Sequence, residues 1–144
     1  MNFCTKQDYR KFPASVIPFE RILADAGIQL FKYYLDITRD EQKRRLRDRS
    51  RDPLTRWKTS PIDGRALAHW DDYTKARDGM LERTHDVRAP WILVQADHKK
   101  SARLNMIRDL VQRIEYPGRA AHLLRPARDF VFPNANASRA RLAR

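Results

Sequence analysis

Two short apolar segments without strict alternation of apolar and polar residues constrain the fold of this chain most. The first spans residues 28–37, and the second, residues 91–94, leads into Gln95-Ala96-Asp97. Strands that are covered on both faces of a parallel sheet have this composition. Because helical patterns separate the two segments, the sequence predicts an α/β fold with few parallel strands. Such a sheet needs more strands than the two recognised.

Three segments with apolar residues at helical spacing predict amphipathic helices. They cover residues 19–26, 60–84 and 99–114. Gly27 follows the first where a glycine commonly ends a helix. The N-terminal residues are expected to form loop, with a short turn that Thr5 could cap.

A fourth helix is predicted directly after the first strand. Thr38 is followed three residues later by Glu41, which is the spacing of a helix capping box. The helix runs to about residue 50 and has Leu46 as nearly its only apolar residue. A helix that is polar on almost every face packs poorly on a core, so we expect this one to project.

The charge of the chain predicts a polyanionic partner. Its 144 residues include 30 Lys and Arg against 18 Asp and Glu, a formal charge of +12. Nucleic acid, polyphosphate, nucleotides and anionic membrane surfaces all fit that charge. No apolar run approaches the ~20 residues of a membrane span. The single cysteine, Cys4, indicates a reducing compartment, and we expect a cytoplasmic protein.

The histidines and the carboxylates predict no metal site within the chain. Four histidines and one cysteine show no metal-ligand spacing. Asp71 and Asp72 are neighbours on a predicted helix, so their side chains point apart. Residues 117–144 contain prolines, many arginines and little periodicity, and we expect them to form a basic, weakly ordered tail.

An ordered set of motifs resembles the C-terminal half of the polyphosphate kinase 2 family. It covers roughly residues 3–116, so residues 1–116 are expected to form the C-terminal part of such a domain. The motifs are Phe3-Cys4-Thr5, Phe19-Glu20-Arg21-Ile22-Leu23, Gly27-Ile28-Gln29-Leu30-Phe31-Lys32, Glu41-Gln42 followed by Arg44-Arg45, Asp52-Pro53, Arg56-Trp57-Lys58 with Ser60-Pro61, Trp70-Asp71-Asp72-Tyr73-Thr74, Ala89-Pro90-Trp91, Ala96-Asp97 and Ala102-Arg103-Leu104-Asn105.

The resemblance implies a three-layer P-loop kinase fold. It also implies Mg²⁺-dependent phosphoryl transfer between inorganic polyphosphate and nucleoside mono- or diphosphates. Residues 38–62 would form a basic helical lid over the phosphate chain. The sequence departs from the family because none of its four glycines belongs to a G-x-x-x-x-G-K-[ST] phosphate loop. The strand that carries the family's magnesium ligand is missing as well. We therefore expect the isolated chain to be inactive unless the N-terminal half of the domain is supplied, by a further segment or within a homo-oligomer.

The lid supplies the candidate catalytic residues, Arg44, Arg45, Arg56 and Lys58. Residues 38–58 hold nine basic and four acidic residues. Phosphoryl transfer depends on positioning and charge stabilisation, which such cations provide. The alternative is a solvated charged helix, the common fate of such a run.

Three further residues have alternative interpretations. Asp97 and Lys99 follow the second strand and are candidate nucleotide-binding residues, or Asp97 caps a helix and Lys99 is a surface charge. Trp57 either stacks on a base or packs at the lid hinge. A non-catalytic polyanion-binding or regulatory protein is the alternative function, while no nucleic-acid-binding motif accompanies the charge.

Overall fold

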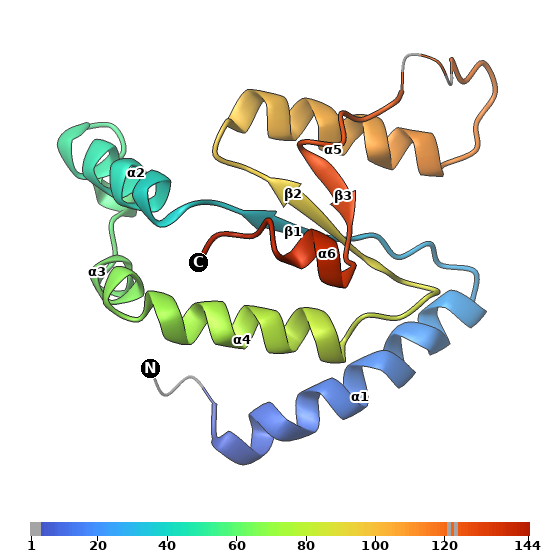
Figure 1. Cartoon of the computed structure of the whole chain (residues 1–144), viewed down its shortest axis with the longest axis horizontal. Helices are drawn as coiled ribbons and strands as arrows, with labels where there is room; N and C mark the ends of the chain where they lie inside the picture. The colour runs from blue at the N-terminus through green and yellow to red at the C-terminus, as the bar shows by residue number, and fades with distance from the viewer. Residues whose placement is uncertain (1–3, 121, 123) are drawn as a thin grey trace.

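A computed structural model of the chain describes residues 4–120, 122 and 124–144, which form a three-layer α/β arrangement (Figure 1). The strands are β1 (Lys32–Asp36), β2 (Trp91–Gln95) and β3 (Val131–Pro133). The helices are α1 (Lys6–Asp25), α2 (Arg39–Arg51), η1 (Arg56–Lys58), α3 (Pro61–Ala68), α4 (Trp70–Arg83), α5 (Lys99–Arg113) and α6 (Asn136–Arg139). The α/β prediction is confirmed.

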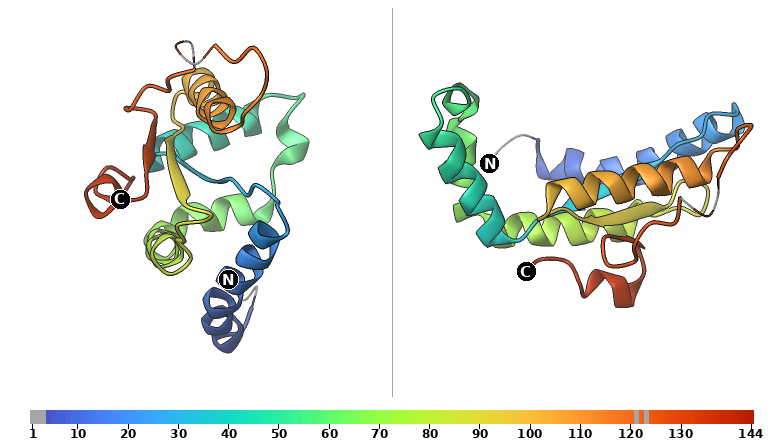
Figure 2. Two further views of the ribbon diagram at one scale, coloured as in Figure 1. Left: turned by 90° about the vertical axis from the view of Figure 1, so that its right-hand side faces the viewer. Right: turned by 90° about the horizontal axis from the view of Figure 1, so that it is seen from above.

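The sheet has the order β1-β2-β3. β1 and β2 are parallel, with Tyr34 opposite Leu93 and Asp36 opposite Gln95, whereas β3 runs antiparallel to β2. Both predicted strands are therefore present, and the carboxyl ends of β1 and β2 meet at one edge of the sheet. α5 covers one face, and α4 covers the other, with α1 beyond it (Figures 1 and 2).

The core is divided between the two faces of the sheet. On the α5 side, Ile92, Val94 and Ala102 pack with Val131. On the α4 side, the buried set is Leu81, Leu93, Phe132 and Leu142. The alternation of side chains along β2 explains this division, since Ile92 and Val94 point to one face and Leu93 to the other.

The C-terminal segment differs from its predicted weak order. Val131, Phe132 and Leu142 are at most 5% exposed, and β3 pairs with the outer edge of β2. The prediction is therefore wrong for this part of residues 117–144. The prediction rested on amino-acid composition, which does not show that pairing with a free sheet edge can order a three-residue segment.

Helix boundaries differ from prediction in two places. α1 begins at Lys6, after a capping box between Thr5 and Asp8, and continues through Pro13 and Pro18. The long helix predicted over residues 60–84 is divided at His69 into α3 and α4. None of the described helices is long and apolar enough to cross a membrane.

A buried lysine connects α1 to the sheet. Lys32 is 8% exposed, and its Nζ donates hydrogen bonds to Glu20 Oε2 and to the Thr84 carbonyl oxygen, each at 2.7 Å. The same ammonium lies 5.1 Å from the centre of the Trp91 ring. This buried charge is stable because carboxylate, carbonyl and ring face all partner it.

Candidate functional site

Among the predicted site residues, Arg45 and Asp97 meet at the carboxyl ends of β1 and β2. α2 and α3 project from the layered body at this edge (Figure 2). The helix α2 starts at Thr38, whose hydroxyl accepts a hydrogen bond from the Glu41 N–H at 3.2 Å, as the capping pattern predicts. No residue of α2 is buried, so the prediction that this helix projects is confirmed. Ligand sites of open α/β sheets lie at this end of the strands.

Arg45 fastens α2 to the end of β2. Its Nη2 donates to the carbonyl oxygens of Ala96 and Asp97 at 2.5 and 3.1 Å, and its Nε donates to Glu41 Oε1 at 2.6 Å. The Asp97 carboxylate in turn accepts a hydrogen bond from the Thr38 N–H at 2.8 Å. Arg45 and Asp97 therefore meet, as residues that hold the two strand ends together.

Arg44 lies on the same helix but bonds only within it. Its guanidinium donates to both carboxylate oxygens of Glu41, at 2.7 and 2.8 Å, and to Asp48 at 2.8 Å. The hydrogen bonds from Arg44, with further bonds from Arg45, lower the pKa of Glu41 to about 2. Glu41 is therefore ionised throughout the physiological range.

Arg56 and Lys58 lie in η1 and are exposed. The guanidinium of Arg56 has no hydrogen-bond or ion-pair partner among the described residues, and the Lys58 ammonium lies 5.1 Å from the centre of the Trp57 ring. Trp57 is 74% exposed, and its Nε1 donates to the Leu54 carbonyl oxygen at 2.9 Å. The packing alternative for Trp57 is therefore wrong. This group offers two cations and an aromatic face to solvent.

The loop after β2 shows that Asp97 does not cap the following helix. The cap of α5 is His98, whose ring accepts a hydrogen bond from the Ser101 N–H, so the interpretation of Asp97 as the helix cap is wrong. Lys99 is the first residue of α5 and is exposed. The partner of Asp97 is Thr38, which lies 59 residues earlier, so no local sequence pattern predicts this contact.

A second group of charged side chains, from β1 and α4, lies at the same edge. Asp36, 3% exposed, ends β1, and Arg77, 7% exposed, reaches it from α4. Arg77 Nη1 donates to Asp36 Oδ1 at 3.3 Å, and Arg77 Nε donates to Asp78 Oδ1 at 2.9 Å. The signal available in the sequence was an arginine on the otherwise apolar face of a predicted helix.

The C-terminal residues complete this pair. The Ala143 N–H donates to Asp36 Oδ2 at 2.8 Å, and the Ala143 carbonyl oxygen accepts from Arg77 Nη1 at 2.7 Å. Burial raises the pKa of Asp36, while the Ala143 N–H and the Arg77 guanidinium act in the opposite direction. The segment after β3 thus binds both members of the pair through its backbone.

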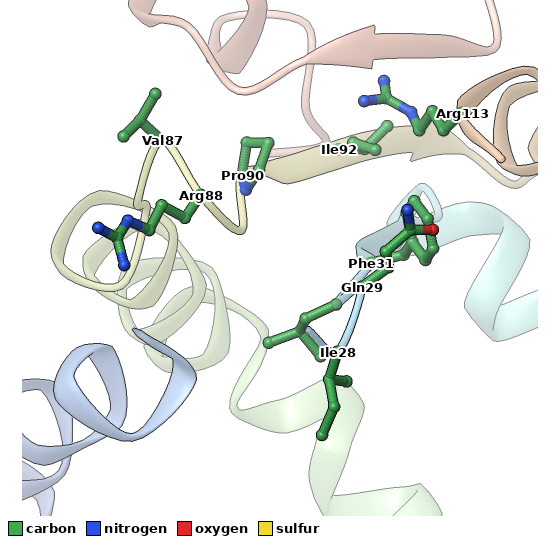
Figure 3. A pocket seen from close by; sticks show the side chains of 9 residues that line it. Ile28, Gln29, Phe31, Val87, Arg88, Pro90, Ile92 and Arg113 are labelled. Carbon is green, nitrogen blue, oxygen red and sulfur yellow. The ribbon is translucent and has the colours of Figure 1, made fainter. Parts of the chain in front are cut away.

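A cavity of about 470 Å³ lies at the other end of the sheet (Figure 3). Its arginines are already paired, Arg88 with Asp25 and Arg113 with Asp109. Because it adjoins the amino ends of the parallel strands, it also lies opposite the usual ligand edge. None of the predicted site residues lines it.

The described residues do not fit a magnesium ion. Among them, no group of three His, Cys, Asp or Glu side chains could hold a metal. At the carboxyl edge, both oxygens of Asp36 already accept hydrogen bonds. We therefore derive no chemical step through a metal held by this part of the chain.

Comparison with known proteins identifies the family. The family model for polyphosphate kinase 2 (PPK2) matches residues 1–122. The chain is similar to the NDP-polyphosphate phosphotransferase 2 of Ruegeria pomeroyi, with 43% identity over 124 residues, 86% of this chain and 36% of that protein. It is 50% identical over 116 residues to the ADP-polyphosphate phosphotransferase of Pseudomonas aeruginosa, covering 81% of this chain and 38% of the relative.

Solved structures agree with the sequence relatives. The polyphosphate kinase 2 of Arthrobacter aurescens superimposes with a TM-score of 0.66 and 32% identity, over 80% of this chain and 43% of that one. A putative polyphosphate kinase 2 from Pseudomonas aeruginosa has a TM-score of 0.70 and 33% identity, over 75% and 23%. The chain therefore spans less than half the length of these relatives. The resemblance seen in the motifs is confirmed, and the chain belongs to the polyphosphate kinase 2 family.

Proposed function

We propose that the chain supplies part of a phosphotransferase that moves phosphoryl groups between inorganic polyphosphate and nucleoside mono- or diphosphates. Family membership carries this proposal, together with the names of relatives that act as ADP-, GDP- or NDP-polyphosphate phosphotransferases. The cationic helix α2, which begins directly after the carboxyl end of β1, supports it. A phosphate chain needs rigid, permanently charged donors at such an edge.

Within this proposal, residues 38–62 act as the lid over the phosphate chain. Arg56 and Lys58 contact phosphoryl oxygens, because they are exposed and outside any ion pair with the described carboxylates. Arg45 positions the lid through the Ala96 and Asp97 carbonyl groups. Arg44 contributes its charge while it remains bonded to Glu41.

The nucleotide side of the reaction is assigned to the loop after β2. Asp97 lies beside the start of α2, and Lys99 is exposed at the first position of α5; both contact the nucleotide in this proposal. Magnesium would neutralise the phosphate oxygens during transfer, with ligands from outside the described residues. We place the reaction in the cytoplasm, because the single cysteine, Cys4, fits a reducing compartment.

Phosphorylation of nucleoside diphosphates from polyphosphate tests the proposal directly. Since the sequence has no G-x-x-x-x-G-K-[ST] motif, we expect no turnover by the chain alone. Addition of a family segment that carries the phosphate loop should restore turnover, and Arg56→Ala/Lys58→Ala should reduce it at least tenfold. Turnover by the unassisted chain would contradict the need for that loop.

A non-catalytic polyanion-binding role is the second candidate function. The formal charge of +12, without a phosphate-loop motif, favours it. Competition between polyphosphate and duplex DNA across a salt series distinguishes specific from general binding, since both weaken by counterion release. Preference for polyphosphate at matched charge, lost in Arg56→Ala/Lys58→Ala, supports the lid. Equal competition by DNA points to general charge attraction.

A further inference from the structure

A groove lies beside β3, the last strand in the sheet order β1-β2-β3 and therefore at the opposite side of the sheet from the free edge of β1. Its volume is about 740 Å³. Apart from Gln112 of α5, the described residues that line it come from residues 125–141, beyond residue 122 where the family match ends. This C-terminal groove includes three arginines, Arg125, Arg128 and Arg141.

The C-terminal groove is cationic. Its three arginines are exposed, and among the described residues none of them forms an ion pair. No Asp or Glu side chain of the described chain lines the groove, although Asp129 follows Arg128 directly in the sequence. Cations that gather in a concave surface without counter-charges raise its positive potential. The groove therefore favours an anionic ligand.

Arg141 is held in one position by the backbone and a ring. Its Nη1 and Nη2 donate to the carbonyl oxygens of Arg128 and Asp129 at 3.1 and 3.0 Å. Its guanidinium carbon lies 4.0 Å from the centre of the Phe132 ring. These contacts leave its Nε–H without a partner among the described residues. A guanidinium that is fixed in this way loses little conformational entropy when it binds an anion.

The loop that carries Arg125 and Arg128 is anchored to α5. Asn105 of α5 is 4% exposed, and its Oδ1 accepts a hydrogen bond from the Ala127 N–H at 2.7 Å. The Ala127 carbonyl oxygen accepts from the Phe130 N–H at 3.0 Å, which closes a turn. The backbone between the two arginines is therefore fixed, while their side chains are free to reach a ligand.

The groove adjoins the proposed lid at the carboxyl end of β2. Gln95 Nε2 donates to the Arg141 carbonyl oxygen at 3.1 Å, and the Gln95 N–H donates to the Phe130 carbonyl oxygen at 2.8 Å. Arg45 of α2 binds the carbonyl oxygen of the next residue, Ala96. An anion long enough to cross this strand end would contact cations of both the lid and the C-terminal segment.

The chemistry of the groove indicates a chain of phosphate groups. Its volume lies within the range of small-ligand sites and exceeds that of a single phosphate, so several linked groups fit. Guanidinium groups can bind phosphoryl oxygens through two parallel hydrogen bonds. Single-stranded nucleic acid would need exposed aromatic rings for its bases. Phe132, the one aromatic residue among the described lining residues, is 5% exposed and lies against Arg141, which favours polyphosphate over nucleic acid.

We propose that the C-terminal groove binds a distal run of phosphate groups of a long polyphosphate chain. Arg125 and Arg128 contact phosphoryl oxygens, and Arg141 donates through its Nε–H. The inference rests on the proposed function, since the reacting end of the same chain lies under the lid. Linked binding at two sites raises the overall affinity without a new contact at either site. We therefore expect long-chain polyphosphate to bind more tightly than tripolyphosphate, which occupies one site at a time.

Paired substitutions separate the groove from general charge attraction. Arg125→Gln/Arg128→Gln should weaken the binding of long-chain polyphosphate to the whole chain about tenfold, the loss expected for two exposed charge contacts. The slope of log K against log salt should become shallower by about two, because each lost phosphate contact releases one counterion fewer. Arg10→Gln/Lys11→Gln removes the same charge from α1 and is the matched control, since both side chains are exposed and lie outside the groove. It should change the affinity less than about twofold, because solvent and salt screen charges outside the contact.

Nuclear magnetic resonance reports on the groove and the lid separately. The Arg141 Nε–H signal, assigned with Arg141→Lys, reports on the groove. The Trp57 indole N–H signal, assigned with Trp57→Phe, reports on the lid beside Lys58. Long-chain polyphosphate should shift both signals in a saturable manner. In Arg125→Gln/Arg128→Gln, the shift of Trp57 by tripolyphosphate should keep its wild-type midpoint, because the lid is unaltered.

An Arg141 signal that long-chain polyphosphate does not shift would overturn the proposal, as would an equal loss of affinity in the control variant. Equal shifts of Arg141 by single-stranded DNA at matched charge would overturn the assignment to phosphate chains. A shift of Trp57 alone would overturn the groove and leave the lid in place. A shift of Arg141 alone would support the groove and contradict the proposed lid.

Discussion

Asp36 and Arg77 form a buried ion pair between β1 and α4. Their side chains are only 4% and 5% exposed. Arg77→Met would leave the Asp36 carboxylate buried with one fewer partner, and we expect a loss of about 3 kcal/mol in the free energy of unfolding. Urea denaturation measures it. Asp36→Leu in the same chain should recover part of the loss, whereas additive losses would contradict a coupled pair.

Glu41 gives a pH dependence that can be predicted in sign. Folding lowers its pKa from 4.5 to about 2, so its ionised form stabilises the folded chain above pH 4.5. This contribution is lost as the pH falls from 4.5 towards 2. The melting temperature of Glu41→Gln should lie below that of the wild type at pH 6, and the difference should narrow at pH 3.5. A difference that is constant with pH would contradict the assignment.

Residues that act on near neighbours were predictable, and residues with distant partners were not. The caps at Thr5 and Thr38 follow from contacts three residues away, and both are confirmed. The partner of Asp97 lies 59 residues away, and that of Asp36 at Ala143 lies 107 residues away. No local pattern encodes such pairs. This is why neither Arg77 nor Ala143 was predicted as a partner of Asp36.

Among the elements, α2 depends on Arg45 for its position. No residue of α2 is buried, so the hydrogen bonds of Arg45 to Ala96 and Asp97 replace the usual apolar contacts. We expect Arg45→Met to lower amide hydrogen-exchange protection in residues 39–51 about tenfold, as for one charge-assisted hydrogen bond. Arg44→Met is the matched control, because Arg44 bonds only within α2. Equal effects of the two variants would contradict the assignment.

Helices and strands with a strong local sequence pattern were predicted correctly, and those with a weak pattern were not. α2 and α5 have clear caps or periodicity, and they occur close to where the sequence predicts them. The start of α1 was missed because Pro13 and Pro18 usually end helices, yet here they lie within one. β3 has only three residues, and it becomes a strand because the outer edge of β2 is available to pair.

At the scale of the whole molecule, residues beyond the family match complete the structure. The family model ends at residue 122, whereas β3 and α6 follow it. This segment covers the edge of β2, contributes Leu142 to the core and bonds Asp36 through Ala143. The layered body therefore depends on a segment that the family pattern does not include.

Leu142 tests whether that segment belongs to the cooperative unit. It is 3% exposed and packs with Leu81, Leu93 and Phe132 across the α4 face. Leu142→Ala should lower the free energy of unfolding by about 3 kcal/mol, because the cavity cannot fully collapse between a helix and a sheet. Leu104→Ala on α5, where the leucine is 50% exposed, is the matched control and should cost far less. If the segment were a separate, weakly ordered tail, the two variants would melt alike, and proteolysis after residue 128 would leave the melt unchanged. A large loss for Leu142→Ala, with single transitions in both variants, means that residues 129–144 fold together with the family domain.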